Sequence, residues 1–303
     1  LFSHKLEVPV IAIGNITTGG TGKTPAAIWL IKKLQALNFP KPILISRGYG
    51  KDEIELFRQN LHQTPHFINS KRYIAGCQAI QEHGTDICLV LDDAFQHRYL
   101  KRDINIVLIE CTMPFGFNHL LPRGFLRESL SNLERADIII LTRSNMVTSK
   151  QLANIQKKIT AFTSAIQLTA IHALDTICEL KTQKILDCKC LANKKIFAFT
   201  GIGNPQSFID TLKPLKIKLI GTKYYPDHHN YKQQDINELI KLAKLKNVQG
   251  FITTSKDAVK LKKFSNIQFP VWTVNVKFKI TQQEEEFFKI LSNKIVKNFD
   301  LCT

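Results

Sequence analysis

The sequence has no uncharged apolar run near the roughly 18 residues that a membrane-spanning helix needs, and it shows no secretory signal peptide. It therefore predicts a chain without a transmembrane helix. The seven cysteines lack paired CxxC spacing, so they favour a reduced, cytosolic protein over a disulfide framework or a zinc ribbon. Acidic residues are scarce: 25 Asp and Glu face 42 Lys and Arg, which gives a net charge of +17.

This cationic excess predicts an anionic partner, which is a nucleic acid, an acidic membrane surface or a phosphorylated substrate. Part of the excess is a bias toward lysine, because all nine arginines lie between Arg47 and Arg143. Arginine is the residue favoured for bidentate phosphate contacts, so we expect the phosphate-reading side chains in that stretch. No aromatic residues interleave with Lys and Arg on a strand face, and no basic recognition helix is found. A nucleic-acid partner is therefore not expected.

Apolar, β-branched runs alternate with helical patterns along most of the chain. In the first half we expect strands at 9–13, 42–46, 87–91, 104–109 and 138–141, with helices at 24–37, 53–60 and 71–82. This alternation predicts an α/β fold, a parallel sheet with helices on both faces. A second series has strands at 195–200, 216–221, 250–254 and 270–276 and helices at 206–212, 233–245 and 281–297. We expect a first lobe over 1–150, a connecting region over 151–194 and a smaller C-terminal α/β lobe over 195–303.

The strongest chemical signal is a glycine-rich loop, GNITTGGTGKT at 14–24, between an expected strand and an expected helix. Glycines let backbone N–H groups approach phosphates closely, and the helix N-terminus adds positive charge. Lys23 would reach the β- and γ-phosphates, and the Thr24 hydroxyl would join a magnesium shell. The strict GxxxxGK[ST] pattern asks for glycine where this chain has Thr17, and a turn without a ligand is the alternative. We predict a P-loop NTPase whose phosphate-binding residues are Gly19, Gly20, Thr21, Gly22, Lys23 and Thr24.

Two adjacent acids, Asp92 and Asp93, directly follow the apolar run at 87–91. A carboxylate at the C-terminal end of a parallel strand beside a P-loop is where a Walker-B aspartate holds magnesium, usually through water. The alternative is a helix cap or a solvated loop. Together with the P-loop, the pair predicts a Mg²⁺ site formed by Thr24, Asp92 and Asp93.

Further polar clusters leave alternatives open. Several arginines near the phosphate end of the sheet suit recognition of a second phosphate, or they form surface ion pairs. In the second lobe, His228 and His229 follow a strand as a metal pair, a proton shuttle or an exposed loop. The string TTSKD at 253–257 is a helix start, or it places Lys256 near a nucleotide.

In their order along the chain, these strings resemble the tetraacyldisaccharide 4′-kinase family, the lipid A 4′-kinases of Gram-negative bacteria. The strings are GGTGKTP, SRGYG, DDAFQH, LPRGFLRE, FTGIGNP, PDHH and TTSKD. The resemblance implies a kinase that uses ATP and Mg²⁺. It would transfer the γ-phosphoryl group to the 4′-hydroxyl of a tetraacylated glucosamine disaccharide 1-phosphate. It also implies a peripheral protein at the cytoplasmic face of the inner membrane, in contact with anionic lipid.

The resemblance also implies roles for residues. Asp52 matches the family's catalytic base and His228 its supporting histidine, and closure of the two lobes is expected to bring them together and exclude water. Only Lys51 separates Gly50 from Asp52, whereas relatives carry a hairpin-sized stretch there. The substrate-binding residues that we expect are Arg47, Gln96, His97, Arg123 and Arg127.

Two other hypotheses compete with the lipid kinase. The first is a deviant-Walker P-loop ATPase that acts as a membrane or nucleic-acid switch. The second is a degenerate kinase-fold protein that keeps the P-loop but lacks the base, and the short link before Asp52 is the feature that raises it.

Overall fold

A computed structural model describes residues 3–48, 50–264 and 266–295, and the chain divides into two compact units. Unit 1 takes in the described residues up to 48, residues 57–171 and the described residues from 278 onward. Unit 2 takes in residues 50–56 and 172–277. This division differs from the expected boundaries, because residues 151–194 are split between the two units and the C-terminal segment returns to unit 1.

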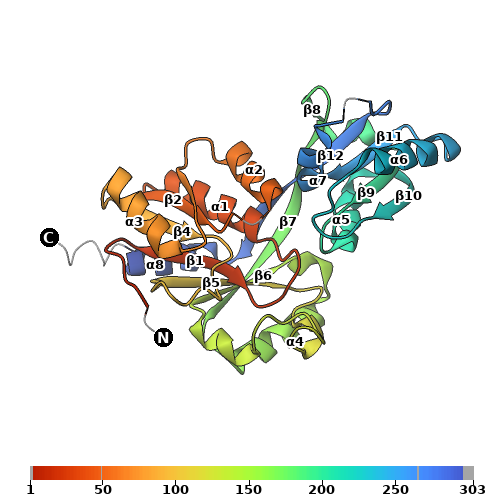
Figure 1. The fold of residues 1–303 in the computed structure, drawn as a ribbon. Coiled ribbons are helices and arrows are strands. Elements are labelled where there is room, and N and C mark those ends of the chain that lie inside the picture. The colour runs from red at the N-terminus through yellow and green to blue at the C-terminus, as the bar shows by residue number, and fades with distance from the viewer. Residues whose placement is uncertain (1–2, 49, 265, 296–303) are drawn as a thin grey trace. The chain divides into compact units, whose positions relative to one another are not determined.

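Unit 1 is built on a parallel sheet with the strand order β7-β6-β5-β1-β4-β2-β3 (Figure 1). Its strands are β1 (Val10–Asn15), β2 (Lys41–Ser46), β3 (His66–Ile68), β4 (Ile87–Leu91), β5 (Ile104–Glu110), β6 (Ile138–Thr142) and the first part of β7 (Ile166–Glu179). Each neighbouring pair in this order runs parallel. Such strands are apolar along their whole length because helices cover both faces.

The helices of unit 1 lie on both faces of this sheet, as the sequence predicts. They are α1 (Lys23–Ala36), the end of α2 (Lys51–Asn60), α3 (Arg72–His83), α4 (Ser149–Thr160) and α8 (Glu284–Ile295). Ile11 and Ile13 of β1 pack with α1 and α8, whereas the alternate residues Val10 and Ala12 pack with α3. The helix α4 covers the same side as α3, over β5 and β6.

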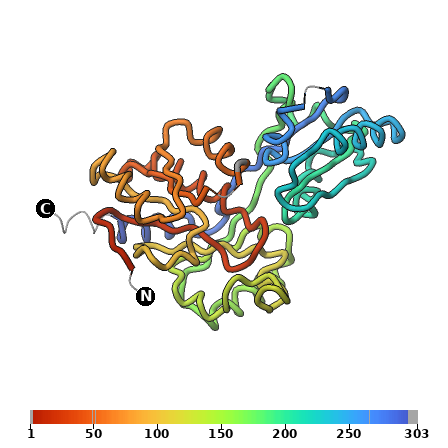
Figure 2. The backbone as a smooth tube through the Cα atoms, viewed as in Figure 1, coloured from red at the N-terminus to blue at the C-terminus, as the bar shows by residue number. Residues whose placement is uncertain are grey.

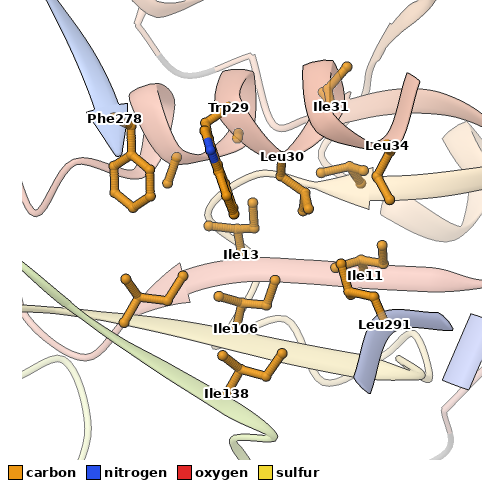
Figure 3. Packing of buried hydrophobic residues seen from close by; sticks show 14 of the residues in the cluster. Ile11, Ile13, Trp29, Leu30, Ile31, Leu34, Ile106, Ile138, Phe278 and Leu291 are labelled. Carbon is orange, nitrogen blue, oxygen red and sulfur yellow. The ribbon is translucent and has the colours of Figure 1, made fainter. Parts of the chain in front are cut away.

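Packing against α1 explains why α8 belongs to unit 1. Figure 3 shows Trp29 and Leu30 of α1 pointing toward β1. The Trp29 ring lies 5.5 Å from the ring of Phe278 and 5.3 Å from that of Phe287, centroid to centroid. Burial of a large apolar side chain stabilises a fold by about 1.5–3 kcal/mol, so this cluster firmly fixes the last helix on the first unit.

The strands of unit 2 follow the order β10-β9-β11-β12-β7, and β8 pairs with β7; all of them belong to the same 12-stranded sheet as the strands of unit 1. Unit 2 contains the rest of β7, β8 (Ile185–Leu186), β9 (Lys195–Thr200), β10 (Lys218–Tyr224), β11 (Gly250–Thr254) and β12 (Val271–Gln282). Its helices are the start of α2, α5 (Pro205–Leu212), α6 (Gln233–Leu245) and α7 (Ser255–Leu261). Phe197, Phe199 and Phe251 face α6, while Ile196, Ala198 and Ile252 face α5. Figure 2 traces β7 and β12, the two strands that pass from one unit into the other.

The described cysteines are free thiols in this structure. Short 3₁₀ helices cover Gly116–Asn118, Leu130–Arg135, Ser144–Met146, Cys188–Leu191 and Lys213–Leu215. Within the residues that the structure describes, no helix is long and apolar enough to cross a membrane.

Candidate active site

The glycine-rich loop connects β1 to α1 at the carboxyl edge of the unit 1 sheet. Gly19 has a φ of +105° and Gly22, the residue before α1, has a φ of +93°; both values lie in the left-handed region that favours glycine. A Cβ atom on Gly19 or Gly20 would meet no atom within 4 Å, so the backbone borders open space there. This is the geometry that a phosphate cradle requires.

Neighbouring strands hold the loop in place through its polar atoms. The Asn15 side-chain amide donates to Thr21 Oγ1 at 2.9 Å, and Thr142 Oγ1 donates to the carbonyl of Thr21 at 3.0 Å. Arg143 donates to the carbonyl of Gly20 at 3.0 Å and pairs with Glu110 at 2.6 Å. Arg143 was not among the predicted site residues, although its position directly after β6 places it at the same sheet edge as the loop.

Two of the three predicted magnesium ligands, Asp92 and Asp93, follow β4 at this edge, and Asp93 faces the P-loop lysine. Asp93 Oδ1 lies 3.7 Å from Lys23 Nζ and 2.8 Å from Arg127 Nη1. Burial alone would raise the pKa of the Asp93 carboxyl, but Lys23, Arg127 and Arg72 outweigh burial and lower it. Asp92 is buried beside it, and its carbonyl accepts from Arg72 at 3.4 Å. Asp93 is therefore held ionised.

The DDAFQH string packs directly against β1. A Cβ atom at Gly14 would lie 2.6 Å from Phe95 Cβ, which explains the glycine at the end of this strand. The Gln96 side-chain amide donates to the carbonyl of Asn15 at 2.8 Å and to Glu128 at 2.7 Å. Gln96 thus ties the DDAFQH and LPRGFLRE strings to the start of the P-loop.

The predicted substrate residues fall into two groups. Gln96 and Arg127 bind other protein groups near the P-loop, whereas Arg47 and Arg123 are exposed. Burial, followed by the charges of Arg72, Arg102 and Arg47, lowers the pKa of His97. Contact of the five predicted substrate residues with the substrate stays a prediction.

Asp52 and His228 form a hydrogen-bonded pair within unit 2. His228 Nδ1 lies 3.1 Å from Asp52 Oδ2 and 3.3 Å from Oδ1, and Lys260 Nζ lies 3.3 Å from the same Oδ2. Because residues 50–56 belong to unit 2, the pair exists inside one unit. The expectation that lobe closure assembles this pair is wrong.

The short link before Asp52 is compatible with this pair. Gly50 has a φ of +87°, and α2 begins at the next residue, so Asp52 lies in the first turn of the helix. A Cβ atom at Gly50 would lie 3.0 Å from Asp52 Oδ1 and 3.6 Å from His228 Cε1. The glycine therefore allows the chain to turn immediately into the helix that carries the carboxylate.

The surrounding charges and the mutual hydrogen bond shift the pKa values of Asp52 and His228 in opposite directions. Burial would raise the pKa of Asp52, yet the hydrogen bond from His228 and the charges of Lys260 and Lys256 lower it. The hydrogen bond to Asp52 raises the pKa of His228 against the opposing effect of burial. The His228 side chain is 37% exposed whereas that of Asp52 is 4% exposed, so the imidazole is the accessible member.

A fully buried carboxylate on α7, that of Asp257, organises the loops around the pair. Asp257 accepts hydrogen bonds from the Thr200 and Thr254 hydroxyls, from Tyr231 and from the backbone N–H of Gly201. The carbonyl of Gly201 in turn accepts from the backbone N–H of His228 at 3.1 Å. One side chain thus links the FTGIGNP, PDHH and TTSKD strings.

The remaining motif residues have structural partners. His229 Nε2 lies 3.0 Å from Asp235, and its ring stacks on Tyr225, so the two adjacent histidines engage different carboxylates. Lys256 pairs with Glu53 at 2.9 Å. Lys260 was not identified from the sequence, although its i+4 spacing from Lys256 puts both cations on one face of α7.

A parallel sheet with a glycine-rich loop between β1 and α1 and paired acids after β4 defines a P-loop nucleotide-binding protein. The Asp–His pair adds a group suited to accept a hydroxyl proton, which is typical of a kinase. The family model described as "LpxK: Tetraacyldisaccharide-1-P 4'-kinase" matches residues 1–56 and 51–296, and the chain belongs to this family of lipid kinases. The two matched pieces meet at 51–56, where the link before Asp52 is short.

Similar proteins agree with this assignment. The chain is 34% identical over 322 residues to the tetraacyldisaccharide 4′-kinase of Halothermothrix orenii, covering 91% of this chain and 82% of that protein. It is 35% identical over 313 residues to that of Syntrophus aciditrophicus, covering 93% and 83%. The crystal structure of the "apo" form of LpxK from Aquifex aeolicus in complex with ATP superposes with a TM-score of 0.71 at 26% identity, covering 97% of this chain and 91% of that one.

Proposed function

We propose that this chain transfers the γ-phosphoryl group of ATP to the 4′-hydroxyl of a tetraacylated glucosamine disaccharide 1-phosphate, a late step of lipid A biosynthesis. It would act as a peripheral protein on the cytoplasmic face of the inner membrane, without a nucleic-acid partner. Family membership supports the substrate class, and the ATP-bound relative supports the nucleotide. The Asp52–His228 hydrogen bond carries the proposal, because a switch ATPase needs a phosphate loop but no acceptor for a sugar proton.

The P-loop edge fits a magnesium–ATP complex. The open space at Gly19 and Gly20 would admit phosphate oxygens, and Lys23, the first residue of α1, would bind the β- and γ-phosphates. The Thr24 hydroxyl and the carboxylates of Asp92 and Asp93 supply the hard oxygen donors that Mg²⁺ prefers. When bound, Mg²⁺ offsets the charge that develops on the phosphates during transfer.

The exposed member of the pair is the better proton acceptor. Nδ1 of His228 is hydrogen-bonded to Asp52, whereas Nε2 lies 4.0 Å from Asp227 Oδ1, beyond hydrogen-bond distance, so Nε2 is the ring atom that would accept the proton of the 4′-hydroxyl. Asp52 then accepts the Nδ1–H bond, fixes the tautomer and stabilises the imidazolium. This reverses the roles that the family resemblance implies, in which Asp52 is the base and His228 its support.

The test is a phosphotransfer assay with γ-labelled ATP, Mg²⁺ and purified tetraacyldisaccharide 1-phosphate in detergent. We expect label in the lipid with the unmodified protein and none with Lys23→Ala. His228→Gln should lower kcat by about a hundredfold or more with ATP affinity kept, a typical general-base contribution. His62→Gln, an exposed histidine in the α2–β3 connection, is the matched control.

The outcomes separate the competing hypotheses. Lipid that stays unlabelled while ATP is hydrolysed would support a switch ATPase, and lipid that stays unlabelled without hydrolysis would support a degenerate kinase. Normal turnover by His228→Gln would show that the pair is not the proton acceptor. A larger loss from Asp52→Asn than from His228→Gln would restore the base role of Asp52.

A further inference from the structure

One loop of unit 1 presents large apolar side chains to solvent. The loop spans residues 113–125 and is called here the apolar loop. Phe117 is 63% exposed, and Leu120 and Leu121 are each 51% exposed; Met113 and Phe125 are exposed as well. Scattered surface apolar residues are ordinary, but five from one short segment are a mark of an interaction site.

The backbone conformation of the apolar loop is specific and held by hydrogen bonds. Gly116, Phe117 and Asn118 all have φ values between +50° and +62°, a conformation that non-glycine residues rarely adopt. Hydrogen bonds close the loop at its base: the N–H of Phe125 donates to Gly116, and that of Gly124 donates to Leu120. A frayed segment would not keep such a conformation, so the side chains are held outward by the fold.

Cations border the apolar loop. Residues 112–126 contain no Asp or Glu, and Arg123 within them is exposed. The neighbouring helix α4 carries three lysines and no acid. One of them, Lys158, donates to Asn118 Oδ1 and lies 4.5 Å from the Phe115 ring centroid. The surface thus combines protruding apolar groups with positive charge.

The same loop is attached to the P-loop. The backbone N–H of Thr18 donates to the carbonyl of Phe125 at 2.8 Å, and that of Arg127 donates to Ile16 at 2.7 Å. The position of the apolar loop is therefore coupled to the position of the nucleotide-binding loop.

We propose that the apolar loop docks this protein on an anionic lipid bilayer. Phe117, Leu120 and Leu121 enter the boundary between headgroups and acyl chains, while Arg123 and the α4 lysines bind lipid phosphates. A second copy of the chain is a poor occupant, because it would bring like charges together. The proposal rests on the proposed function, since the lipid substrate of such a kinase resides in a membrane.

The test is co-sedimentation with vesicles of phosphatidylcholine, with and without phosphatidylglycerol. The unmodified protein should sediment with the anionic vesicles, less so at high salt. The variant Phe117→Ser/Leu121→Ser should bind at least about tenfold more weakly, because two apolar groups no longer leave water. The matched control is Ile185→Ser/Leu245→Ser, which alters exposed apolar residues of unit 2 and should bind normally.

Activity and oligomeric state complete the test. With substrate dispersed in detergent, the loop variant should keep its turnover and its thermal unfolding midpoint, whereas with substrate in vesicles its turnover should fall. Vesicle binding is measured without turnover, so this result tests membrane docking even if the protein phosphorylates no lipid. Unchanged vesicle binding by the loop variant would overturn the proposal. Loss of turnover by the loop variant in detergent would also overturn it, because the loop would then bind the acyl chains of the substrate. A dimer of the unmodified protein that the loop variant abolishes would overturn it as well, because the loop would then be an interface between two copies of the chain.

Discussion

Replacing Lys260 with Met tests whether the cation beside Asp52 sets the properties of the candidate proton acceptor. The two side chains are nearly buried, and Lys260 Nζ lies 3.3 Å from Asp52 Oδ2. Methionine keeps most of the apolar stem and removes only the charge, while Lys260→Arg keeps the charge. The comparison therefore isolates the electrostatic contribution.

The expected magnitude follows from the distance. At 3.3 Å and an effective dielectric constant of about 20, a cation and a carboxylate attract by about 5 kcal/mol. Part of this is offset because both charges lose hydration, and breaking such a pair from one side costs about 3–5 kcal/mol. His228 still donates to Asp52 in the variant, so we expect a loss of about 3 kcal/mol in the free energy of unfolding near neutral pH.

The effect of Lys260→Met on stability should depend on pH in a definite direction. The pKa of Asp52 is lowered below its ordinary 3.8, so the ionised carboxylate stabilises the fold above that value and the benefit is lost as the pH falls below it. Removal of Lys260 moves this pKa upward. The stability difference between the unmodified protein and Lys260→Met should therefore be largest near neutral pH and shrink below pH 3.8.

Urea unfolding at several pH values measures this difference, and kcat against pH measures its effect on phosphotransfer. Lys260→Arg should recover most of both. Equal stability of Lys260→Met and the unmodified protein near neutral pH, or a difference that does not vary with pH, would refute the electrostatic account.

Three further predictions concern the P-loop, the buried carboxylate and the imidazole. Gly14→Ala should lower the free energy of unfolding by about 1–3 kcal/mol, because its Cβ would overlap a neighbouring side chain at 2.6 Å, whereas Gly20→Ala, which meets open space, should unfold like the parent in urea. Asp257→Asn should destabilise the protein by about 3 kcal/mol in the same assay and lower kcat, since an amide cannot accept at both ends from four donors. Turnover should rise with pH through a pKa above 6.5, because His228 must lose its proton before it can accept another. Asp52→Asn should move the midpoint of this rise to lower pH, because the variant removes the carboxylate that raises the pKa of His228. A kcat that does not change with pH in this range would contradict the role of the imidazole.

The sheet could be predicted closely because its strands are buried on both faces. Residues 87–91, 195–200 and 250–254 form strands with the expected bounds, since mainly apolar, buried segments of a parallel sheet carry a clear local signal. The strand β7 was missed because polar residues interrupt it, and one end lies in each unit. The helix α4 was missed in a lysine- and glutamine-rich stretch, although Thr148 and Gln151 form a capping box that marks its start.

From the residues alone, the site could be predicted only where its members follow one another in the chain, and the distant pair Asp52 and His228 was expected only through the family resemblance. The P-loop and the acids after β4 are contiguous strings whose chemistry depends on local geometry. The partners Lys260 and Asp257 act through contacts that the tertiary fold creates, so neither stands out in its own segment. The two units differ from the expected division into lobes for the same reason, because packing of α8 on Trp29 joins residues far apart in sequence.

The two carboxylates that matter most are held in the same way, and this argues against a degenerate kinase. Asp93 lies between Lys23 and Arg127, and Asp52 lies between His228 and Lys260. In each case surrounding positive groups overcome burial and lower the carboxyl pKa. Keeping a buried carboxylate such as that of Asp52 ionised is costly unless its partners are well placed. A protein that had lost its base would gain nothing from the arrangement at Asp52, whereas a phosphotransferase needs one fixed charge for its metal and another to hold its proton acceptor.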